Sequence, residues 1–73
     1  MQISITYCTQ WNYKPKAVSL AAKIESELGF KTILIPEGRG IFDVVVDGNL
    51  IYSKFETGSF PDEVQLVAEI SVI

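Results

Sequence analysis

Histidine is absent from this 73-residue sequence, and cysteine occurs once, at Cys8. The absence of histidine excludes imidazole metal ligands and every catalytic triad that depends on a histidine base. A single cysteine excludes an intramolecular disulfide, so the chain does not have the framework of a small secreted domain. We therefore expect a cytoplasmic protein. Because its acidic residues also lack the spacing of a metal-binding loop, we expect no metal and no resident cofactor.

Positive charge is scarce as well. Six lysines and arginines stand against nine acidic residues, which gives a formal net charge of −3 at pH 7. The cations are scattered and form no basic stripe, so we expect no nucleic-acid partner. No apolar run approaches the roughly 20 residues of a membrane-spanning helix, and the N-terminus shows no signal-peptide pattern. These absences lead us to expect no membrane contact.

Apolar residues, by contrast, are abundant. They make up 48% of the chain, while charged residues make up 21%, a balance typical of a folded chain. The length allows one domain, which we expect to span residues 1–73. The mean hydropathy of +0.27 is high for so small a protein. We therefore expect a homodimer to cover apolar surface, through the uncovered sheet face or an edge strand over 50–55.

The hydropathy pattern predicts four strands and two helices. Residues 2–7 alternate between apolar and polar side chains, which indicates a strand with one covered face. From Asn12 to Leu28 apolar residues recur at helical spacing, with Asn12 as the expected cap and Gly29 as the expected stop. Further strands are expected over 31–36, 41–46 and 50–55, with a tight hairpin at 47–49. A second helix is expected to open at Pro61 and to bury Val64, Leu66, Val67, Ile70 and Ile73.

The predicted order β-α-β-β-β-α indicates an α/β (α+β) fold. The first strand, the first helix and the second strand form a parallel unit with a right-handed crossover, and the hairpin adds an antiparallel pair. Both helices should cover one face of the sheet, because the first strand has a single strongly apolar side. This arrangement matches the minimal thioredoxin-like core, with a four-stranded mixed sheet of strand order 2-1-3-4.

The position of Cys8 is the most informative feature of the chain. It follows the first predicted strand and precedes the first predicted helix, so its sulfur should face the unpaired amides at the positive end of that helix. Such a placement lowers a thiol pKa from about 8.5 into the range of roughly 3.5–7.5 and favours an exposed, reactive thiolate. The alternative interpretation is a buried cysteine that packs as a small apolar residue.

Several short motifs resemble those of one family. The loop Tyr7–Lys14, Pro36-Glu37-Gly38, Ile41–Val44, Asp47-Gly48 and Gly58–Pro61 occur in the order found in selenoprotein W-like (Rdx) proteins. That resemblance implies a thioredoxin-like fold and a thiol-dependent redox role, with glutathione or protein thiols as partners. The family carries a Cys-x-x-Cys or Cys-x-x-selenocysteine pair, whose second position is Trp11 in this sequence.

The missing second cysteine leaves three hypotheses for function. Cys8 can form a mixed disulfide with glutathione or a protein and be resolved by an external thiol, an oxidoreductase-like activity without a resolving cysteine. It can also be oxidised to a sulfenic acid and then capped. In the third hypothesis the chain is a non-catalytic binding module. Whether the protein is an enzyme stays open at this point.

Four residues near Cys8 are candidates for binding: Thr9, Gln10, Trp11 and Arg39. The first three belong to the loop that follows the first strand. Trp11 either covers the thiol or offers a flat contact to a ligand, or it packs against Tyr13 or the loop before the third strand. Arg39 either pairs with a glutathione carboxylate or is simply solvated.

Overall fold

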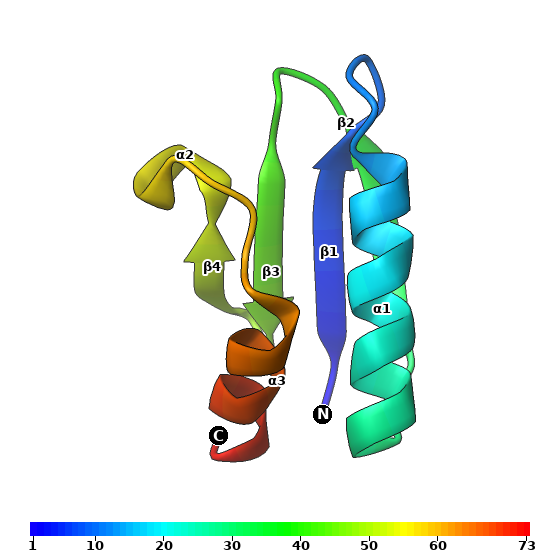
Figure 1. The fold of residues 1–73 in the computed structure, drawn as a ribbon, viewed down its shortest axis with the longest axis vertical. Coiled ribbons are helices and arrows are strands. Elements are labelled where there is room, and N and C mark those ends of the chain that lie inside the picture. Colours follow the sequence, from blue (N-terminus) through cyan, green and yellow to red (C-terminus); the bar gives the residue numbers. More distant parts are fainter.

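The computed structural model describes residues 1–73 and contains one four-stranded mixed sheet, in the order β2-β1-β3-β4 (Figure 1). The strands are β1 (Ile3–Cys8), β2 (Thr32–Glu37), β3 (Phe42–Val46) and β4 (Asn49–Ser53), and the helices are α1 (Lys14–Leu28), α2 (Lys54–Thr57) and α3 (Glu63–Ser71). β1 pairs in parallel with β2, whereas the β1–β3 and β3–β4 pairs are antiparallel. The thioredoxin-like fold and the strand order expected from the sequence are confirmed.

One face of the sheet carries the hydrophobic core. Alternation along β1 turns Ile3, Ile5 and Tyr7 toward this face, and the register sets Ile5 opposite the buried Val44 of β3. Helices α1 and α3 cover the same face (Figure 1), and their buried residues join one cluster with the strands. The helical members of that cluster are Ala17, Leu20, Ile24, Leu66, Val67 and Ile70.

The opposite face of the sheet is more open. Ser4 and Thr6 of β1 lie there, paired with Ile33 and Ile35 of the edge strand β2. Both isoleucines are exposed, as is Leu50 on the other edge strand, β4. None of the helices combines the length and the apolarity that crossing a bilayer requires.

One end of helix α1 is where the sequence predicted it, and the other is not. Helix α1 begins at Lys14 and has Tyr13, not Asn12, at its N-cap, where no side chain bonds to the first turn. It stops as expected at Gly29, whose φ of 77° is left-handed and whose amide donates to the Glu25 carbonyl. Asn12 was a wrong choice because it still belongs to the turn over residues 9–12, and the helical backbone starts only at Lys14.

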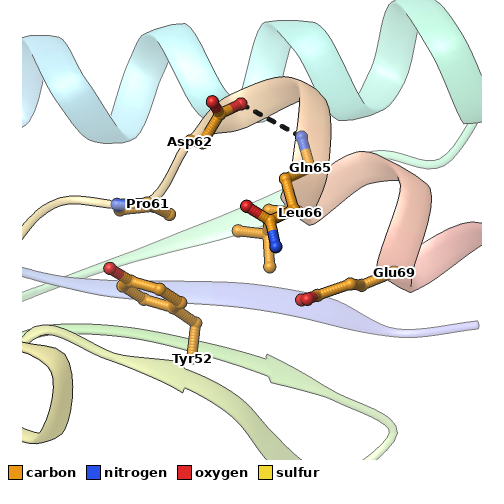
Figure 2. A pocket seen from close by; sticks show the side chains of 6 residues that line it. All are labelled: Tyr52, Pro61, Asp62, Gln65, Leu66 and Glu69. Atoms are coloured by element: carbon orange, nitrogen blue, oxygen red, sulfur yellow. Dashed lines mark hydrogen bonds between the residues drawn. The ribbon is translucent and has the colours of Figure 1, made fainter.

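Helix α3 does have a side-chain cap. The Asp62 carboxylate accepts a hydrogen bond of 3.1 Å from the Gln65 amide (Figure 2). Figure 2 also shows the side chains of Gln65 and Glu69 extending from α3 toward Tyr52 of β4, around a pocket of about 80 Å³. This pocket contains no thiol, and Cys8 is not among its lining residues.

Two further expectations are wrong at the C-terminal third of the chain. The fourth strand ends at Ser53 rather than Phe55, because residues 54–57 turn into the short helix α2, which leaves Phe55 64% exposed. In α3, Val64 and Ile73 are exposed instead of buried. The helix ends at Ser71, and Val64 lies on its solvent side, so the buried stripe consists of Leu66, Val67 and Ile70.

Candidate functional site

The candidate site lies where β1 ends and the chain turns toward α1. The Cys8 amide donates to the Ile41 carbonyl at 2.8 Å, and the Thr9 amide donates to the Glu37 carbonyl at 2.9 Å. The Thr9 hydroxyl donates to the same Glu37 carbonyl at 3.0 Å. The end of β1 is therefore fixed to the last residue of β2 on one side and to Ile41, in the loop that connects β2 with β3, on the other, at one end of the sheet (Figure 1).

The Cys8 sulfur is enclosed and surrounded by backbone donors. The residue has no exposed surface, so the exposed thiol expected from the sequence is wrong. Burial acts to raise the pKa of the thiol, and the amides of Trp11, Gly40 and Gln10 together lower it by more, so the pKa lies below its ordinary value. The Trp11 amide lies 3.4 Å from Sγ.

The source of these donors also differs from the expectation. The sequence predicted that the first amides of the helix would face the sulfur, but α1 begins only at Lys14. The donors belong instead to the turn after β1 and to Gly40, which lies in the loop before β3. Successive backbone amides that converge on one atom form an anion-binding nest, and a thiolate is the anion that this nest suits.

Trp11 packs against both of the neighbours proposed for it. Its ring lies edge-on to Tyr13, with centroids 5.7 Å apart, and it contacts Gly40 so closely that a Cβ there would overlap the ring. Gly40 also has a φ of 71°, so glycine suits this position both for its backbone and for its missing side chain. The indole remains 57% exposed and still presents a surface to solvent.

A chain of aromatic contacts connects the loop with the core. Tyr13 meets Phe60 at a centroid distance of 4.8 Å, and Phe60 meets the buried Phe42 at 5.3 Å, both in edge-on geometry. The Lys54 ammonium lies 5.5 Å from the Tyr13 ring and 5.4 Å from the Phe60 ring. These contacts fix the C-terminal end of the loop, at the start of α1.

Two hollows flank the loop, and Gln10 lines both. One, of about 420 Å³, lies against Thr9, Trp11 and Lys14. The other, of about 720 Å³, is lined by Thr6, Gln10, Glu37, Gly38, Arg39, Ile41 and Phe55. The structure therefore places Thr9, Gln10 and Trp11 around the smaller hollow and Gln10 and Arg39 around the larger one, and Cys8 lines neither. Arg39 lies in the facing loop with a left-handed φ of 65°.

Gly40 is the site residue that sequence reasoning missed. The only signal was its place in Glu37-Gly38-Arg39-Gly40, a stretch that the sequence identifies as a loop without showing what the loop approaches. Tyr13 and Phe60, which support the loop, lie in the motifs Tyr7–Lys14 and Gly58–Pro61, but neither motif indicates that their rings meet. No group of three or more acidic or cysteine side chains converges as a metal site requires.

The fold and this cysteine define a small thioredoxin-like domain with a thiol site at the carboxyl end of its first strand. The profile of the Rdx family matches residues 2–72, and the chain belongs to the Rdx family.

Named relatives agree with that assignment. Selenoprotein W of Macaca mulatta is 32% identical over 85% of this chain and 76% of its own length. Migration and invasion enhancer 1 of Bos taurus is 30% identical over 96% of this chain. The chain spans 62% of the length of that relative.

Solved structures agree as well. The selenoprotein W-related protein of Vibrio cholerae superposes with a TM-score of 0.90 at 25% identity, over 96% of this chain and 91% of that one. A protein of Bordetella parapertussis gives a TM-score of 0.91 at 26% identity, over 96% and 92% of the two chains.

Proposed function

We propose that the chain is a thiol-redox protein of the selenoprotein W type that performs monothiol exchange through Cys8. The observation that carries the proposal is the 3.4 Å contact from the Trp11 amide to the Cys8 sulfur, in a site where the amides of Gly40 and Gln10 also lower the thiol pKa. Such donors stabilise the thiolate that the exchange requires. Membership of the Rdx family supports it. We place the reaction in the cytoplasm, where glutathione keeps thiols reduced.

The exchange has two balanced steps. The Cys8 thiolate attacks one sulfur of glutathione disulfide, a new S–S bond forms, the old one breaks, and one glutathione thiolate leaves. A thiolate from glutathione or from a protein then attacks the mixed disulfide and releases Cys8 as a thiolate. The second thiol must come from another molecule, because Cys8 is the single cysteine of the chain.

The larger hollow is where we place the glutathionyl group. Arg39 and Gln10 line it beside the Cys8 loop and offer a guanidinium and an amide to a carboxylate and a peptide bond. Ile41 and Phe55 give the same hollow an apolar side. A tripeptide with two carboxylates and one thiol matches this combination of groups.

Intact-protein mass spectrometry after incubation with glutathione disulfide tests the proposal. We expect one glutathionyl adduct at near-neutral pH, its removal by reduced glutathione, and no adduct on Cys8→Ser. Arg39→Ala should form the adduct more slowly if the guanidinium binds the tripeptide. An adduct that forms only on the chain unfolded in urea would contradict the proposal, because Cys8 would then be an inert core residue.

A second candidate function is favoured by the exposed indole of Trp11 beside a buried thiol. In this hypothesis the loop from Cys8 to Tyr13 recognises a protein and the sulfur takes no part. Binding to such a partner should survive Cys8→Ser and weaken in Trp11→Ala. The reverse order would exclude the binding module and support the redox function.

A further inference from the structure

The contact between Trp11 and Gly40 joins the two loops that surround Cys8. The Trp11 amide donates to the Cys8 sulfur at 3.4 Å, and the Gly40 amide lowers the pKa of the same thiol from the other loop. The indole of Trp11 also lies on Gly40, in space that any side chain at position 40 would occupy. While this contact is closed, both loops stay over the sulfur, and Cys8 has no exposed surface.

The segment that carries the indole is held at its two ends. At one end Thr9 bonds to Glu37 through both its amide and its hydroxyl. At the other end Tyr13 packs on Phe60, which in turn contacts the core. The residues between them, Gln10, Trp11 and Asn12, are all exposed. A local movement of this short segment can therefore separate the two loops without disturbing the core.

We propose that the Trp11 indole, seated on Gly40, is a latch that closes the Cys8 site and must be released before a reaction partner reaches the sulfur. This inference rests on the proposed function, since a latch matters only for a thiol that reacts. Cys8 performs the exchange, and Trp11 acts as a positioning residue that controls access to it. In this arrangement the buried state and the reactive state are two positions of one loop.

The rate of Cys8 alkylation by iodoacetamide, measured across pH on the full chain, tests the latch. Iodoacetamide is small and uncharged, and it forms an S–C bond with the thiolate as iodide leaves, so it reports access without any disulfide exchange. Trp11→Ala should raise the plateau rate about tenfold, because losing an aromatic contact of about 1.4 kcal/mol shifts an opening equilibrium by that factor. The pH of half-maximal rate should stay unchanged, because backbone amides remain at positions 10, 11 and 40.

Three more variants separate a latch from a general loss of structure. Trp11→Phe should restore much of the slow rate, since a phenyl ring can still lie on Gly40. Gly40→Ala should react faster than the native chain, because its Cβ displaces the indole. Gly29→Ala is the matched control, because Gly29 has a similar left-handed φ of 77° and no atom within 4 Å of its Cβ position, and its rate should stay native.

Two results would overturn the latch. The first is equal plateau rates for Trp11→Ala and the native chain. The second is a pH midpoint in Trp11→Ala that rises to about 8.5, the value of a free cysteine, without any gain in plateau rate, because the indole would then only hold the amides in place. A different result would contradict the redox function but not the latch: alkylation would accelerate in Trp11→Ala, yet neither the variant nor the native chain would form a glutathionyl adduct.

Discussion

At the scale of single residues, Cys8 combines full burial with a lowered pKa, two properties that ordinarily oppose each other. Removal from water disfavours the thiolate, and a cysteine among hydrocarbon side chains would have a raised pKa. Here three backbone amides lower the pKa, because their N–H groups take the place of the hydrogen bonds that water would donate to the thiolate. The nest thus favours the thiolate inside the fold, relative to a cysteine buried among hydrocarbon side chains.

This pKa shift predicts a pH-dependent contribution to stability. Because the folded pKa of Cys8 lies below the ordinary value of a thiol, the unfolded chain holds the Cys8 proton up to higher pH than the folded chain does. The stabilising contribution is therefore absent below the folded pKa, grows as pH rises through it, and is fully present above the unfolded pKa. Urea unfolding of the native chain and of Cys8→Ser should show a stability difference that increases with pH across this window.

A difference that stays constant with pH, or that shrinks as pH rises, would contradict the lowered pKa. Cys8→Ser is a suitable reference because serine does not titrate in this range and leaves the other ionisable groups in place. Each pH requires both proteins in the same buffer, so that the titration of those other groups cancels.

The sequence predicted the place of this thiol but not its surroundings. Cys8 at the end of an alternating strand is a local signal, readable within the first eight residues. The loop over Cys8 packs on Gly40, which is more than thirty positions away and whose importance comes from the space left by a missing side chain. No pattern within either loop indicates that contact.

At the scale of the elements, the two helix starts offer a direct comparison. Asp62 bonds to the Gln65 amide at the start of α3, whereas no side chain caps α1. Asp62→Ala should lower the free energy of unfolding by about 1 kcal/mol, the usual effect of losing an N-cap. Asn12→Ala is the matched control and should change it by less than about 0.5 kcal/mol, as an exposed substitution without a cap does.

Urea unfolding measures both effects. If Asn12→Ala lowered the free energy of unfolding by more than Asp62→Ala does, α1 would begin earlier than Lys14 in solution. The sequence misplaced that start because Asn12 is a good cap residue by type, and type alone does not say which turn the helix uses. It missed α2 for a similar reason, since four residues are too few to show helical periodicity.

At the scale of the whole molecule, the strand order and the placement of α1 and α3 could be predicted because they follow from chain-long patterns. Alternation in β1, the crossover through α1 and the tight turn at Asp47 and Gly48 each allow few topologies. The turn has positive φ values of 49° and 83°, as a two-residue hairpin requires. The patterns also predicted an uncovered second face of the sheet, but not which apolar side chains lie on it, because Ile33, Leu34 and Ile35 of β2 are apolar without alternation.

Two isoleucine substitutions on opposite faces of the sheet test how the whole domain is stabilised. Ile5 of β1 is fully buried on the face of the sheet that the helices cover, whereas Ile33 is 58% exposed on the edge strand β2. Ile5→Ala should cost about 2–5 kcal/mol through lost burial and a residual cavity. That is a large part of the roughly 4–11 kcal/mol expected for a domain of this length. Ile33→Ala should cost less than about 1 kcal/mol in an isolated chain.

The same pair tests the homodimer that we propose on the basis of this open face. If a second copy covers Ile33, the cost of Ile33→Ala should approach that of a buried position and grow with protein concentration, because dissociation then accompanies unfolding. Thermal unfolding at several concentrations, together with sedimentation equilibrium, distinguishes the two cases. A cost below 1 kcal/mol at every concentration, with only 8.1 kDa particles in the centrifuge, would exclude the homodimer and leave the open face to another partner.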